Sequence, residues 1–168
     1  MNYNVLMVGA PGCVKTSLIN RFTTGDINTV NKLFHRVKLH LLVYGKRRKL
    51  YLNIVESNNI EADICHARYD ATLLFFDIRE PYGDVLSLIS TLTGQDYECG
   101  HIVVCAAKTD VGPSGIDKII QGLKADGTIY DYIHTSAKTC KGLTAPFLSL
   151  ARLCCGSNTV LDPCFCSD

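Results

Sequence analysis

The chain has 168 residues, of which 47% are hydrophobic and 20% charged, and a formal net charge of +1. This length suits one domain with its own core, and the hydrophobic content excludes a disordered chain. The near-zero net charge gives no support for a nucleic-acid partner or an acidic membrane. No apolar stretch reaches the ~20 residues of a membrane span, and the N-terminus does not resemble a signal peptide. We therefore expect a cytoplasmic protein whose nine cysteines are mostly reduced thiols.

The predicted elements alternate between strands and helices. In chain order we predict strands at 5–8, 37–44, 49–55, 71–78, 101–106 and 129–134, and helices at 15–22, 85–92, 116–123 and 145–155. The second and third strands alternate apolar and polar residues around the basic run Gly45–Lys49, which we interpret as the solvated turn of an antiparallel hairpin. The remaining pattern predicts one α/β domain over residues 1–155. Its sheet is mostly parallel and six-stranded, with that one hairpin and with helices on both faces. Residues 156–168 are assigned to a short tail.

A candidate phosphate-binding loop, Gly9–Thr16, joins the first strand to the first helix. It follows the GxxxxGK[ST] pattern except that Val14 stands at the second glycine position. Lys15 offers a charge for phosphate and Thr16 offers a hydroxyl for Mg²⁺. Val14 puts bulk where the backbone must approach phosphate, and Pro11 removes one N–H donor. An ordinary strand-to-helix turn remains the alternative for the loop taken alone.

Two downstream motifs place this loop in a wider pattern. Ala106–Asp110 follows a buried strand, and His134–Thr139 follows the last strand. With the loop, they resemble the Ras superfamily of small GTPases in order, spacing and strand context, from about residue 4 to 155. The resemblance implies a small G-protein fold that binds GTP or GDP with Mg²⁺. It assigns phosphate binding to Gly9, Gly12, Lys15 and Thr16, Mg²⁺ binding to Thr16, and guanine binding to Lys108, Asp110, Ser136, Ala137 and Lys138.

The chain departs from the family pattern mainly at the phosphate end. Ala107 replaces the asparagine that ties the base loop to the phosphate loop. Counted without gaps from Lys15, Phe34 falls where the Mg²⁺ threonine is expected, and Thr29 upstream is the alternative if the loop is shifted. Glu56 falls where an aspartate supports Mg²⁺ through water. Asn59 replaces a glycine that contacts the γ-phosphate. Ile60 replaces the glutamine that orients the attacking water, a task that an aliphatic side chain cannot perform. We therefore expect GTP hydrolysis to be weak or absent, and name no catalytic residue.

The tail contains Cys164 and Cys166, close to but not matching the paired cysteines that carry prenyl groups in Rab-type relatives. They are candidate lipidation sites, and a free tail is the alternative. No polybasic stretch supplies a second membrane signal. By family analogy, the partner surfaces would be the edge Phe34–Tyr44 and the segment Glu56–Tyr69.

Three functional hypotheses follow. The first is a divergent Ras- or Rab-like switch that holds guanine nucleotide and acts in signalling or vesicle traffic through effector proteins. The second is a pseudo-GTPase, a scaffold of the same fold that binds no nucleotide. An ATP-using phosphate-loop enzyme has the least support, because Asp110 favours guanine. We expect a monomer, cytoplasmic or attached to a membrane through the tail cysteines.

Overall fold

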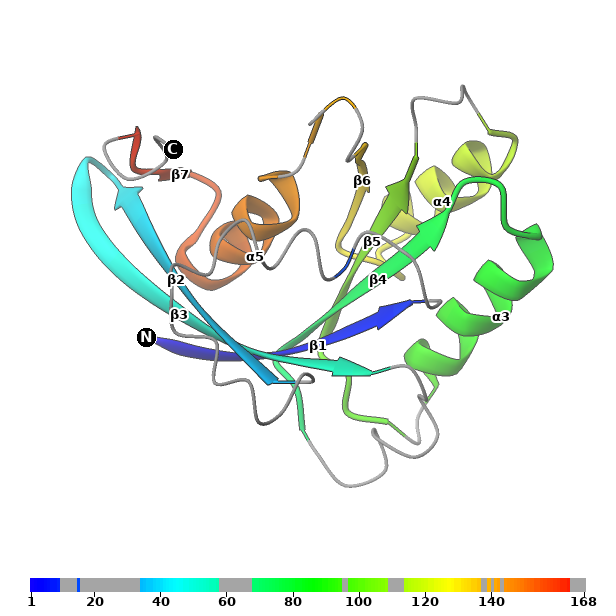
Figure 1. Ribbon diagram of the computed structural model, residues 1–168, viewed down its shortest axis with the longest axis horizontal. Coiled ribbons are helices and arrows are strands. Elements are labelled where there is room, and N and C mark those ends of the chain that lie inside the picture. Colours follow the sequence, from blue (N-terminus) through cyan, green and yellow to red (C-terminus); the bar gives the residue numbers. More distant parts are fainter. Residues whose placement is uncertain are drawn as a thin grey trace.

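The computed structural model describes residues 1–9, 15, 34–57, 68–94, 97–108, 114–136, 139, 141–142 and 144–163. These residues form a seven-stranded sheet in the order β6-β5-β4-β1-β3-β2-β7, together with three helices (Figure 1). The strands are β1 (Asn2–Gly9), β2 (Phe34–Val43), β3 (Lys46–Ser57), β4 (Ala71–Asp77), β5 (His101–Ala107), β6 (Asp131–His134) and β7 (Thr159–Leu161). The helices are α3 (Tyr82–Thr93), α4 (Ile116–Ala125) and α5 (Ala145–Cys155). The predicted helix at 15–22 lies outside the described residues except for Lys15.

The mostly parallel sheet and its hairpin confirm the α/β prediction. β1 pairs in parallel with β3 and β4, and the parallel pairing continues through β5 to β6. The residues of β4 form a nearly continuous buried run, because both faces of this strand are covered. β2 and β3 pair antiparallel from Val43 opposite Lys46 to Phe34 opposite Val55. Tyr44 and Gly45 make the turn, with positive φ values of 49° and 73°. The basic residues Lys46–Lys49, predicted as part of the turn, instead begin β3 and pair with β2.

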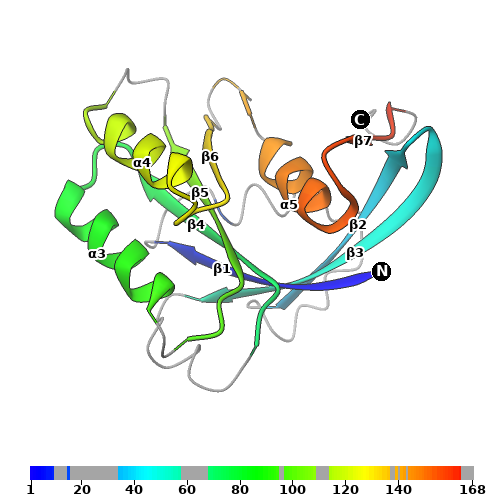
Figure 2. The same ribbon diagram turned by 180° about the vertical axis from the view of Figure 1, so that it is seen from behind.

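Helices cover both faces of the sheet, as predicted. One core cluster joins side chains of β1 to β5 to Phe147 and Leu150 of α5. The other joins the opposite side chains of β1, β4 and β5 to α3 and α4, through residues such as Ile89 and Ile120. Figures 1 and 2 show α5 beside the β2–β3 hairpin, and α3 and α4 toward the other end of the sheet. None of these helices combines the length and apolarity that crossing a bilayer requires, among the residues searched.

The seventh strand corrects the prediction of six. β7 pairs antiparallel with β2 over Leu41–Val43, inside the stretch assigned to a tail. After α5, Gly156 takes a φ of 99°. Its carbonyl accepts hydrogen bonds from the backbone N–H and the hydroxyl of Thr159, which is fully buried. A strand of three residues carries too little alternation to be detected in the sequence. β7 covers part of an otherwise open strand edge.

Candidate functional site

The described members of the predicted site lie at the carboxyl edge of the parallel strands. Gly9 ends β1, Glu56 lies near the end of β3, Lys108 follows β5, and Ser136 comes two residues after the end of β6. Parallel strands end at the same edge of a sheet, and this edge is where open α/β folds bind ligands. The topology therefore brings together residues that are far apart in the sequence.

Gly9 is required by the close approach of β1 to β4. A Cβ atom at this position would lie 2.5 Å from the backbone oxygen of Phe75, a contact that real Cβ atoms do not make. The carbonyl of Gly9 accepts a hydrogen bond of 2.6 Å from Nζ of Lys15. The lysine of the loop thus folds back onto the end of the strand that precedes it.

Lys15 is buried beside an acidic residue of β3. Its exposed fraction is 2%, and its Nζ lies 3.8 Å from Oε1 of Glu56, which is itself 8% exposed. The other carboxylate oxygen of Glu56 lies 3.5 Å from Nε2 of His35 on β2. A buried ammonium needs a negative partner, and Glu56 supplies one from within the fold. No sequence motif links Glu56 or His35 to Lys15, so the pattern predicted for Glu56 a role near Mg²⁺ and none for His35.

The described residues do not form an Mg²⁺ site by themselves. Glu56 is the one carboxylate they contribute next to Lys15, and its oxygens already face Lys15 and His35. Phe34 begins β2 with 52% of its surface exposed, and its side chain has no oxygen to offer a metal. In the described part of the chain, no group of three His, Cys, Asp or Glu residues is placed to hold a metal ion. We derive no metal-dependent step for this edge.

Lys108 is held at its charged end by β4. Its Nζ lies 2.7 Å from Oδ2 of Asp77. The Arg79 guanidinium donates to the same carboxylate, at 3.0 Å to Oδ1 and 2.8 Å to Oδ2. The hydrogen bonds from Arg79 and then from Lys108 hold the pKa of Asp77 well below its usual range. Lys108 has a positive φ of 60°, and the preceding Ala107 is fully buried at the end of β5. The head of Lys108 is thus fixed, while the side chain keeps 39% of its surface open.

The segment after β6 is tied to β5. Thr135 is fully buried and donates from its backbone N–H (2.8 Å) and its hydroxyl (3.0 Å) to the carbonyl of Ala106. Ser136 is also buried; its N–H donates to the carbonyl of Lys141, and its hydroxyl accepts from the N–H of Thr139. These bonds fix where the loop leaves the sheet.

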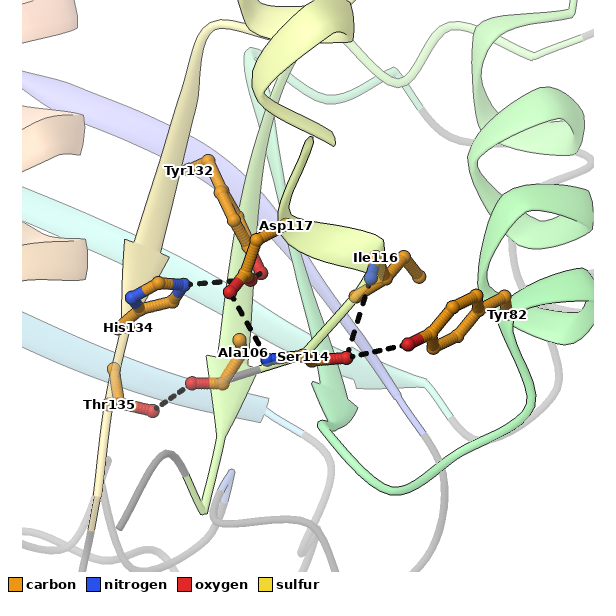
Figure 3. Close-up of polar contacts among 8 residues, drawn as sticks. All are labelled: Tyr82, Ala106, Ser114, Ile116, Asp117, Tyr132, His134 and Thr135. Carbon is orange, nitrogen blue, oxygen red and sulfur yellow. Dashed lines mark hydrogen bonds and ion pairs between the residues drawn. The ribbon is translucent and has the colours of Figure 1, made fainter. Parts of the chain in front are cut away.

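A polar network supports this loop from the side of α4 (Figure 3). Asp117, in the first turn of α4, accepts hydrogen bonds from the Tyr132 hydroxyl at 2.6 Å and from Nε2 of His134 at 3.1 Å, the latter with His134 as donor. Burial would raise the pKa of Asp117, but these bonds lower it below its ordinary value. Ser114 connects the network to Tyr82 at the start of α3, with 3.2 Å between the two hydroxyls. Sequence reasoning missed this network, because no motif links these residues.

The remaining predicted residues lie outside the described part of the chain. They are Gly12, Thr16, Asp110, Ala137, Lys138, Cys164 and Cys166, together with the departures Pro11, Val14, Asn59 and Ile60. Their roles stay predictions.

The strand order, with Gly9 and Lys15 at the carboxyl edge of the sheet, is consistent with a small GTPase fold. Comparison with known proteins finds the GTP-binding nuclear protein GSP1 of Encephalitozoon cuniculi (strain GB-M1), 26% identical over 183 residues. The alignment covers 97% of this chain and 84% of GSP1. No family model matches the chain. The chain is a distant homologue of GSP1.

Proposed function

We propose that the chain is a divergent small GTPase-family protein that binds guanine nucleotide, hydrolyses GTP weakly or not at all, and acts through protein partners. The observation that carries the proposal is that Lys15, Lys108 and Ser136 meet at one edge of the sheet. Lys15 is buried on the Gly9 carbonyl, and Lys108 and Ser136 follow β5 and β6 at the same edge. This is where a phosphate-loop lysine and a base-binding loop belong in such a fold. The name of GSP1 includes both GTP binding and the nucleus, so we propose a nuclear or cytoplasmic protein.

Weak hydrolysis follows from the side chains that the sequence supplies. Phosphoryl transfer depends on positioning and charge neutralisation. Ile60 cannot orient water, and Phe34 cannot bind Mg²⁺, because neither side chain has an oxygen or nitrogen atom. A protein with these residues retains nucleotide more readily than it cleaves it.

One observation favours the pseudo-GTPase alternative. The charge of Lys15 already faces the carboxylate of Glu56. A phosphate group would have to compete with this carboxylate for the lysine and would also be repelled by it. In the pseudo-GTPase alternative, Glu56 therefore takes the place of the nucleotide phosphate as the partner of Lys15.

Titration with fluorescent GDP and GTP analogues, with and without Mg²⁺, tests the proposal. An ATP analogue is the base control, and phosphate release from GTP in the same samples measures hydrolysis. We expect guanine-selective binding that is lost in Asp110→Ala, because the carboxylate of Asp110 would accept the N–H groups of guanine. Asp126→Ala removes an exposed carboxylate at the end of α4 and should leave binding unchanged. Absence of binding at high micromolar ligand would favour the pseudo-GTPase, and equal affinity for ATP would contradict guanine selectivity.

A further inference from the structure

The outer face of the β2–β3 hairpin carries charges that the candidate nucleotide site does not use. Neighbouring residues of a strand point to opposite faces. One set, which includes Leu39 and Leu50, is buried in the core cluster that contains α5. The other set includes Arg36, Lys38 and His40 on β2 and Arg47 and Lys49 on β3.

The register of the hairpin gathers these scattered cations into one patch, called here the basic face: Arg36, Lys38, His40, Arg47 and Lys49. His40 lies directly opposite Lys49, and Lys38 lies opposite Tyr51. Burial, and then the charges of Lys38 and Lys49, lower the pKa of His40. Like charges on neighbouring strands repel one another. An anion bound to this face would relieve that repulsion.

The fold neutralises only part of the basic face. Arg47 pairs with Asp162, whose Oδ2 lies 3.1 Å from Nε and whose side chain is almost fully buried. Arg36 lies 5.0 Å from the centre of the Tyr51 ring. Among the described residues, no carboxylate lies within ion-pair distance of Lys38 or Lys49. These two lysines therefore carry the charge that is open to a partner.

A groove beside the basic face suggests the shape of that partner. Its volume is about 970 Å³, and the described residues that line it are Met1, His40, Arg47, Arg48, Lys49 and Asp162. Met1 contributes an apolar side chain that is 63% exposed, and Val160 on β7 is another exposed apolar side chain, at 45%. Val160 lies opposite Leu42 in the register. A concave groove with apolar and basic groups fits a peptide chain better than the flat surface of a bilayer.

We propose that the basic face and its groove dock an acidic segment of a partner protein, with an apolar side chain of that segment in the groove. Complementary charge would provide orientation and a faster association rate, and the apolar contact would slow dissociation. This deepens the partner part of the proposed function and rests on it, but it does not require a bound nucleotide.

The probe is a short fluorescent glutamate-rich peptide with a central leucine, compared with a glutamine version of the same sequence. Fluorescence anisotropy is measured at low and high salt. We expect Lys38→Gln and Lys49→Gln each to weaken binding about threefold, and the double variant about tenfold. The matched control is Lys118→Gln, an exposed lysine on α4, which should bind like the parent. High salt should weaken the parent more than the double variant.

Phosphatidylserine vesicles and a DNA duplex serve as competing anions. Tighter binding to either one, lost in the double variant, would overturn the proposal and assign the face to a membrane or to nucleic acid. Failure to bind the acidic peptide at low salt, or an equal loss in Lys118→Gln, would also overturn it. Guanine nucleotide titration of the same variants keeps the two proposals apart, because these lysines lie on the hairpin and should not alter nucleotide affinity.

Discussion

The two halves of the carboxyl edge keep their functional residues in different ways. On the half formed by β5 and β6, which we call the base side, Thr135 and Ser136 are fixed by bonds to backbone groups of neighbouring segments. On the half formed by β1 and β3, the phosphate side, Lys15 is held by the Gly9 carbonyl and faces Glu56. On the base side the Lys108 head also pairs with Asp77, but its side chain stays 39% exposed, and backbone hydrogen bonds position Thr135 and Ser136. The phosphate side has its main cation already facing an internal anion.

This difference shows that a motif residue can be present and yet be occupied by the fold itself. Lys15 matches the phosphate-loop pattern, but Glu56 competes for its charge. Loss of nucleotide affinity at such a site does not require loss of the lysine. It requires a neighbouring carboxylate that phosphate must displace.

The largest expected effect comes from breaking the pair on the phosphate side. Glu56→Gln should lower the free energy of unfolding by about 3 kcal/mol, because the buried ammonium of Lys15 loses its negative partner. It should also raise the affinity for GDP. Urea denaturation of this variant, of Lys15→Met and of the double variant completes a double-mutant cycle, which measures the interaction energy between Lys15 and Glu56. Strictly additive effects of the two substitutions would contradict an interaction between Lys15 and Glu56.

A smaller and pH-dependent effect is expected at Asp77, the residue that holds Lys108. Because the pKa of Asp77 is lowered in the folded state, its contribution to stability is full above the unfolded pKa and is lost as pH falls through the folded pKa. Asp77→Asn should therefore cost about 1–2 kcal/mol at neutral pH and progressively less as the pH falls below ~4. Urea denaturation across this pH range checks it, with the exposed Asp84→Asn as the control. A cost that is independent of pH would exclude the charge of Asp77 as the cause.

The smallest effect should come from the base side. Thr135→Val removes one of two hydrogen bonds to the Ala106 carbonyl and should cost about 1 kcal/mol. Guanine affinity should fall with it, since the Ser136 segment loses an anchor. Thr91→Val removes a similar hydrogen bond, to the Ser87 carbonyl on the exposed side of α3. This control should affect stability without affecting guanine binding. Equal guanine affinities for both variants would show that the base side does not depend on this anchor.

Patterns within single segments predicted most of the fold. The hairpin was visible as alternation, and the parallel strands as apolar runs between helices. β7 was missed because three residues carry no readable period. The contacts among His35, Glu56 and Lys15, and those of Asp117 with Tyr132 and His134, were missed for another reason. They depend on strand register and helix placement, which join side chains that no local motif connects.

Whether Glu56 occupies Lys15 is best measured by the affinities of the parent and of Glu56→Gln for GMP, GDP and GTP, each with and without Mg²⁺. If Glu56 occupies Lys15, each added phosphate should change the affinity of the parent by less than about threefold, which is a binding free energy below ~1 kcal/mol. Mg²⁺ should have little effect on these affinities. The Glu56→Gln variant should gain affinity with each phosphate. A steep, Mg²⁺-dependent rise in affinity from GMP to GTP in the parent would show that Lys15 is free for phosphate and that Glu56 does not occupy it.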